Sequence, residues 1–134
     1  MGSPYVGEIR IVAFNFAPAN WALANGQLIP VSQNPTLFNL IGTTYGGDGA
    51  TTFALPNLQG RMPMHMGLGT GLSQRLLGQV GGAENAAFAS ATISSAPQTP
   101  ISALAPTGPE LGSVSPFVVL NFIISLFGIY PSQS

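Results

Sequence analysis

The sequence has no cysteine and no lysine, and few charged residues of any kind. Without cysteine, the chain can form no disulfide, no thiolate metal site and no cysteine nucleophile. Only 5% of its residues are charged, whereas an ordinary globular protein has about 25%. With a net charge of −1, it has neither the basic surface of a nucleic-acid-binding protein nor a polybasic patch for lipid headgroups.

Of the 134 residues, 46% are hydrophobic, and many others have small or amide side chains. This length suits one domain with its own hydrophobic core, and the composition argues against general disorder. A surface with so few charges repels other copies weakly and can be buried at a low desolvation cost. We therefore expect the chain to assemble with itself; a neutral monomer shielded by glycosylation is the alternative.

Long apolar runs are also missing. Residues 1–8 have no basic start followed by an apolar run, so no secretory signal is expected. The longest apolar stretch, residues 117–130, is interrupted by Asn121, Ser125 and Gly128 and falls short of the about 20 residues that a membrane-spanning helix needs. Its Val, Ile and Phe content predicts a buried C-terminal strand over residues 117–124 instead.

The pattern along the chain predicts a mainly β fold with one short helix and long irregular loops. Residues 9–14 are rich in strand formers and open the domain. Asn25-Gly26 accepts the positive φ of a two-residue turn, so residues 21–31 are expected to form a hairpin. Trp21, the only tryptophan, is expected to anchor the core by packing on the short helix.

That helix is expected over residues 34–42. Asn34 suits the N-cap, Pro35 the first helical position and Gly42 the position just past the end. Because the segment has fewer than ten residues, it needs tertiary packing to form. Residues 94–115 are rich in proline, serine and alanine and are expected to form an irregular loop or extended arm.

Three places invite a functional interpretation, and each has a simpler one. Glu8 and Arg10 share one face of a strand, as a solvated ion pair does. Asp48 lies in a glycine-rich loop, residues 43–52, without the lysine of a phosphate loop or the carboxylates of a calcium site, so a tight turn is expected. His65 is the only histidine, too few for zinc unless three copies meet on a threefold axis; a packed or solvent-facing side chain is expected.

No catalytic constellation is visible. A triad has only His65 and Asp48 to draw on, and nothing resembles a nucleophile elbow. The four carboxylates show no spacing that argues for a glycosidase pair, and the dinucleotide fingerprint is absent. We therefore expect no enzyme, no catalytic, cofactor-binding or metal-binding residue and no cofactor. A hydrolase of cell-wall sugars remains a remote alternative.

An ordered set of short motifs covers nearly the whole chain. The first block comprises Gly7-Glu8-Ile9, Ala17-Pro18, Trp21, Asn25-Gly26, Leu37-Phe38, Ile41-Gly42, Tyr45-Gly46-Gly47-Asp48-Gly49, Phe53, Leu55-Pro56-Asn57-Leu58 and Gly60-Arg61. The later blocks comprise His65, Gly67, Gly69, Gly71-Leu72-Ser73, Leu77-Gly78, Gly81-Gly82-Ala83-Glu84-Asn85, Pro116-Phe117, Asn121-Phe122-Ile123-Ile124, Gly128-Ile129 and Pro131. In this order they resemble the phage tail collar domain family, in the branch of microcystin-dependent proteins.

The resemblance implies a trimeric, β-rich domain of short tail fibres that takes part in host attachment. Members commonly carry a Pro-Ser-His-x-His segment, and in tail-fibre relatives such histidines from neighbouring chains hold a metal at the tip. Residues 93–100 occupy that place here and contain no histidine, so the metal site is not carried over. No repeat or coiled coil precedes Gly7 to form a shaft, so a collar domain with little else is expected.

The sequence thus predicts an N-terminal arm, residues 1–6, and a single collar-like domain over residues 7–134. The expected function is a self-assembling structural subunit of an extracellular fibre or phage-tail-like particle, outside the cell or on a virion. The alternative is a trimeric receptor-binding module, an adhesin or tail-fibre tip, that recognises a cell-surface glycan. The expected partner is another copy, with the arm as strand donor and residues 94–115 as packing surface; neither nucleic acid nor a membrane span is expected.

Overall fold

The computed structural model describes residues 3–86, 111–112 and 115–133. Two compact units divide the chain: one combines Met1–Gln79 with Val119–Ser134, and the other is Val80–Val118. In the second unit, the short strands β7 (Asn85–Ala86) and β8 (Leu111–Gly112) pair antiparallel. Apart from Leu111, Gly112 and Ser115, the expected proline-rich loop lies outside the described residues.

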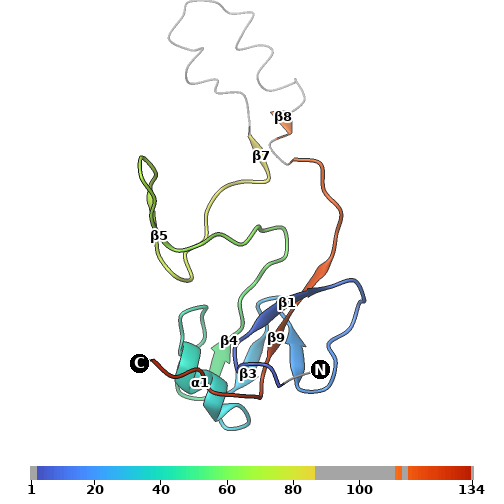
Figure 1. The fold of residues 1–134 in the computed structure, drawn as a ribbon, viewed down its shortest axis with the longest axis vertical. Helices are drawn as coiled ribbons and strands as arrows, with labels where there is room; N and C mark the ends of the chain where they lie inside the picture. Colours follow the sequence, from blue (N-terminus) through green and yellow to red (C-terminus); the bar gives the residue numbers. More distant parts are fainter. Residues whose placement is uncertain (1–2, 87–110, 113–114, 134) are drawn as a thin grey trace, which may run out of the picture. The chain divides into compact units, whose positions relative to one another are not determined.

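The first unit is built on a three-stranded antiparallel sheet in the order β1-β9-β2 (Figure 1). The C-terminal strand β9 (Asn121–Ser125) lies between β1 (Ile9–Val12) and β2 (Trp21–Leu23). In this register Ile124 faces both Ile9 and Ala22, so all three side chains share the face that carries the core. The strand from the far end of the sequence therefore holds the N-terminal half together.

A β-bulge starts the pairing of β1 with β9. The Gly7 amide donates to the Ser125 carbonyl oxygen at 2.9 Å, and the Ser125 amide donates to the Glu8 carbonyl oxygen at 2.9 Å. Two residues thus oppose one, and Gly7 has the positive φ, +83°, that the first position of such a bulge requires. The bulge bends the chain so that the residues before Gly7 leave the sheet.

Residues 4–6 then dock on their own chain rather than forming a free arm. The Val6 amide donates to the Ile129 carbonyl oxygen and the Ile129 amide to the Pro4 carbonyl oxygen, both at 2.9 Å. The Val6 side chain is only 2% exposed and belongs to the core. The expectation of an arm poor in local structure is therefore wrong for these residues, because core burial and main-chain bonds to the C-terminal segment hold them.

The expected hairpin over residues 21–31 is also wrong. The segment does contain two strands, but β2 pairs with β9, and β3 (Leu28–Pro30) pairs with β4 (Thr52–Ala54). The Asn25-Gly26 dipeptide carries the chain from one sheet to the other: the Gly26 amide donates to the Pro56 carbonyl oxygen at 3.1 Å, and Asn25 pairs with Asn57. Bonds to a distant segment outweigh the local turn preference.

The expected helix is confirmed as α1 (Pro35–Ile41). Pro35 opens it, and the Gly42 amide closes it by donating to the Phe38 carbonyl oxygen at 2.8 Å. The Asn34 side chain does not cap the helix; its Nδ2 donates to the Pro30 carbonyl oxygen at 3.2 Å. Asn34 is 8% exposed, so this bond satisfies a buried amide.

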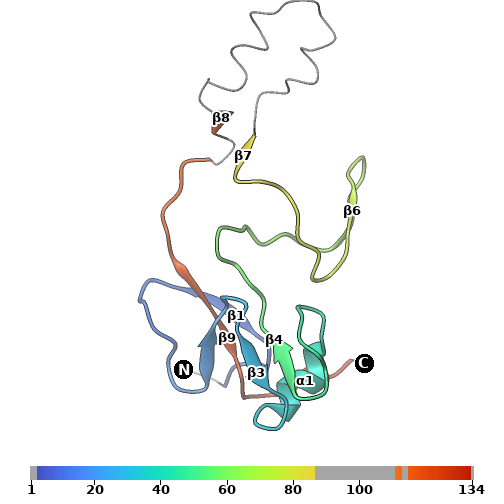
Figure 2. The same cartoon turned by 180° about the vertical axis from the view of Figure 1, so that it is seen from behind.

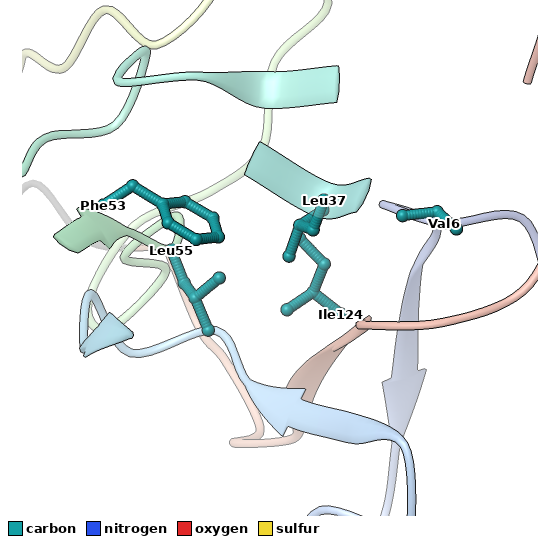
Figure 3. Packing of buried hydrophobic residues seen from close by; sticks show 5 residues of the cluster. All are labelled: Val6, Leu37, Phe53, Leu55 and Ile124. Atoms are coloured by element: carbon teal, nitrogen blue, oxygen red, sulfur yellow. The ribbon is translucent and has the colours of Figure 1, made fainter. Parts of the chain in front are cut away.

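The core lies between the helix and the two sheets (Figures 2 and 3). Its buried members come from four separate segments of the chain: Val6, Leu37, Phe53 with Leu55, and Ile124. The ring of Phe38 adds a tilted contact with Phe53, at 5.3 Å between ring centroids. Trp21 is half-buried and lies outside this cluster, so its expected role as core anchor on the helix is wrong.

The expected strand over residues 117–124 begins late, since β9 starts only at Asn121. Residues 117–120 are between 45% and 81% exposed, and no described strand pairs with them. High strand propensity does not suffice where packing and a hydrogen-bonding neighbour are missing. A small hairpin of β5 (Gly67–Leu68) and β6 (Gln74–Arg75) adds to the β content, and a mainly β fold with one short helix is confirmed.

None of the helices in the described residues has the length and apolar character of a membrane span.

Candidate assembly surface

The outer edge of β1 is a strand edge that the described part of the chain leaves unpaired. β1 has β9 as its neighbour on one side and no described strand on the other. Ile9 and Ile11 alternate along it and are 42% and 59% exposed. They share the core-facing side of the sheet with Ile124, but they lie at its border. An edge of this kind offers free N–H and C=O groups beside apolar side chains.

Two phenylalanines continue the apolar surface beyond β1. Phe14 and Phe16 stack on each other at 4.8 Å between ring centroids and remain 40% and 58% exposed. Their loop is held in place because the Asn121 Nδ2 donates to the Phe14 carbonyl oxygen at 2.8 Å. Ile9, Ile11, Phe14 and Phe16 together are called the apolar edge below. An exposed aromatic pair on a fixed backbone is typical of an interface anchor.

A groove of about 330 Å³ lies at the other border of the sheet, beside β2. Apolar side chains from three segments line most of it: Leu23, Leu58, Val119, Leu120 and Phe122. Asn25 and Asn121 also line it, but their amides already bond within the chain, Asn25 through Oδ1 to the Gln27 amide. The groove therefore suits an apolar or weakly polar occupant.

The charges of this sheet are engaged with one another. The Arg10 Nε donates to the Glu8 carboxylate at 2.6 Å, and the guanidinium lies over the Trp21 ring at 5.2 Å. These contacts lie on the side of the sheet opposite Ile124, where Ile123 is 3% exposed between its neighbours Arg10 and Leu23. The Arg10 hydrogen bond lowers the pKa of Glu8. Glu8 and Arg10 thus form the expected ion pair, and both side chains remain partly exposed to solvent.

The glycine-rich loop is confirmed as a tight turn built around Asp48. Its Oδ1 accepts hydrogen bonds from the amides of Ala50, Thr51 and Thr52 at 2.9–3.0 Å, and Oδ2 accepts one from the Thr51 hydroxyl. The amides of Thr52, Ala50 and Thr51 are the main cause that holds the pKa of Asp48 far below its usual range. With its lone pairs used inside the loop, the carboxylate organises the turn.

The Asp48→Asn substitution is expected to destabilise the fold in a pH-dependent way. The pKa of Asp48 is lower in the folded chain than the about 3.9 of an unfolded aspartate, so the ionised form stabilises the folded state. This contribution is complete above about pH 5 and is lost as the pH falls through the depressed pKa. Thermal melts from about pH 6 to about pH 2 should show wild type and variant converging in acid; a constant difference would contradict the role of the charge.

His65 lies in the segment before β5 and is exposed; its Nδ1 lies 2.8 Å from the Met66 carbonyl oxygen. Among the described residues, no three His, Asp or Glu side chains gather into a metal-binding group.

The apolar edge was missed in the sequence because isoleucine and phenylalanine in a strand pattern predict burial. The only available signal was the near absence of charge, which predicted an apolar contact surface without placing it.

Comparison with known families agrees with this architecture. The phage tail collar domain matches residues 7–63, which begin at the β1 bulge and include β1, β2, β3, α1 and β4. No curated protein matches the chain. Residues 7–63 of this mainly β chain are thus similar to a phage tail collar domain.

Proposed function

We propose that the chain is a self-assembling structural subunit of an extracellular fibre or phage-tail-like particle. The observation that carries the proposal is the apolar edge: an unpaired strand edge with two exposed isoleucines, followed by a loop with two exposed, stacked phenylalanines. Free strand edges in soluble monomers are usually protected by charge, proline or a covering loop. Here Glu8 and Arg10 bond to each other, on the sheet face that Ile9 and Ile11 do not share.

A second copy fits this edge because main-chain groups can extend the sheet across the contact. The two phenylalanines would supply buried apolar area at the same contact, where aromatic anchors contribute most of the binding energy. The first strand donor considered, the N-terminal arm, is less suited, since Val6 lies in the core of its own chain. Deleting residues 1–6 would remove Val6 from the core, so a loss of assembly in that variant could not be separated from a loss of the fold. The proposal also keeps the chain in the microcystin-dependent branch of the collar family.

The test introduces a charge at the edge. Ile11→Glu and Phe16→Glu replace side chains that are 59% and 58% exposed, so both variants should keep the fold, as circular dichroism can verify. Each should abolish large particles in light scattering, because a buried carboxylate without a partner is costly. Thr36→Glu, exposed on α1, is the matched control and should assemble normally. Equal particle sizes for all three variants would show that copies do not join through the apolar edge.

The contact should also resist salt. Ion pairs at an interface weaken when salt screens charges beyond roughly 10 Å at 0.1 M, but the apolar edge contains no charged side chain. Particle size should therefore stay constant or grow as the salt concentration rises.

A second candidate function is a trimeric receptor-binding module for a cell-surface glycan. The groove beside β2 favours it by its size, because about 330 Å³ is the volume of a small-ligand site, and by the Phe122 ring that lines it. A discrete trimer that binds a glycan array, with binding lost in a Phe122→Ala variant that still folds, would favour this function over the filament.

A further inference from the structure

Three of the four methionines of the chain fall within five residues: Met62, Met64 and Met66. Their side chains are 87%, 72% and 51% exposed. Methionine is normally a buried, gap-filling residue, and these three fill no part of the core. The segment therefore presents a concentration of thioether sulfur to solvent.

An extended backbone in this segment allows the three sulfur atoms to reach one another. From Arg61 to the start of β5 it forms neither helix nor turn, and Pro63 restricts Met62 to extended conformations. In an extended chain, residues two apart share one face and are about 6.6 Å apart. Methionine is unbranched with three rotatable bonds, so adjacent thioethers in this series can converge on one ion.

His65 lies between two of these methionines in the sequence. Its Nδ1 lies 2.8 Å from the Met66 carbonyl oxygen. The alternation that places the three methionines on one face of an extended segment places the His65 ring on the other face. His65 is therefore not counted as a ligand of the same ion.

We propose that residues 62–66 bind one soft monovalent ion of the Cu(I) class, through the thioethers of Met62, Met64 and Met66. Thioether sulfur selects such ions over magnesium, calcium and zinc. A single imidazole per chain is too few for zinc unless three copies meet, but that argument does not extend to sulfur-seeking ions. The nearest cation in sequence, Arg61, donates to the Asn57 carbonyl oxygen. The inference does not rest on the proposed assembly.

The test uses Ag(I) as an air-stable probe of this ion class. The intact protein, labelled with ¹³C at the methionine methyls, is titrated with silver nitrate in a chloride-free buffer. One ion per chain should bind by calorimetry, and the methyl signals of Met62, Met64 and Met66 should shift together. Cu(I), added anaerobically in competition with a colorimetric chelator, should bind at the same place, and Zn(II) should cause no shift.

Matched variants separate sulfur chemistry from shape. Met64→Leu keeps the size and apolar character of the side chain and should weaken Ag(I) binding about tenfold, which corresponds to about 1.4 kcal/mol. The triple replacement of Met62, Met64 and Met66 by leucine should abolish binding, and His65→Gln, on the other face of the segment, should leave it unchanged. Absence of binding in the wild type, or unchanged affinity in the triple variant, would overturn the proposal.

Discussion

Replacing Leu37 with alanine is expected to lower the free energy of unfolding by about 2–5 kcal/mol. Leu37 is the buried side chain of α1, fully shielded from solvent among Val6, Phe53, Leu55 and Ile124 (Figure 3). The helix has only seven residues and is too short to be stable alone. The substitution therefore removes both a core side chain and the contact that fixes the helix. Chemical denaturation measured by circular dichroism would give the loss.

Leu28→Ala is the matched control, because it makes the same chemical change at a side chain that is 61% exposed on β3. Its effect should stay within about 0.5 kcal/mol. Equal losses in the two variants would mean that Leu37 is not at the centre of the core.

Gly128→Ala should be nearly as damaging, with an expected loss of about 2–5 kcal/mol. Gly128 has a φ of +143°, and a Cβ added there would clash with the Pro4 carbonyl oxygen. That oxygen accepts the Ile129 amide in the contact that docks residues 4–6. The chain must give up this hydrogen bond or shift its backbone, and either change withdraws Val6 from the core. Amide hydrogen exchange at Val6 and Ile129 should speed up together.

Gly81→Ala is the control for this second prediction, since a Cβ there meets nothing within 4 Å and φ is not positive. This variant should be neutral or slightly more stable, because alanine restricts the unfolded chain. Slow exchange at Val6 in the Gly128→Ala variant would show that the N-terminal contact tolerates the added Cβ.

Local signals in the sequence predicted local structure well. Pro35 and Gly42 set the start and end of α1 because both act through their own backbone preferences. The turn around Asp48 was predicted for a similar reason, since its carboxylate bonds to amides two to four residues away. Such features need no knowledge of the rest of the fold.

Pairings between distant segments could not be predicted in this way. Asn25-Gly26 carries a strong hairpin signal, yet β2 pairs with β9, about a hundred residues further along the chain. The docking of Val6 on Ile129 has the same character. Trp21 was expected in the core because of its size, whereas it lies over Arg10 on the opposite side of the sheet. In each case the position of the residue depends on a partner that is distant in the sequence, so local patterns do not predict it.

The sequence predicted that the chain has a surface for self-association, but not where that surface lies. The shortage of charge led to the expectation of self-association, because little on the surface opposes contact between copies. Its location followed only from the structure, which leaves Ile11, Phe14 and Phe16 exposed at an unpaired edge. A strand pattern reports alternation but not which strand ends a sheet.

The central claim is that copies join through an uncharged apolar edge into an open polymer. Negative-stain imaging of the purified protein, with light scattering over a range of protein and salt concentrations, tests it most directly. A head-to-tail contact that does not close gives filaments of unlimited length, so particle mass should rise with protein concentration and should not fall in high salt. A monomer, or a trimer of constant mass at every concentration, would contradict the account.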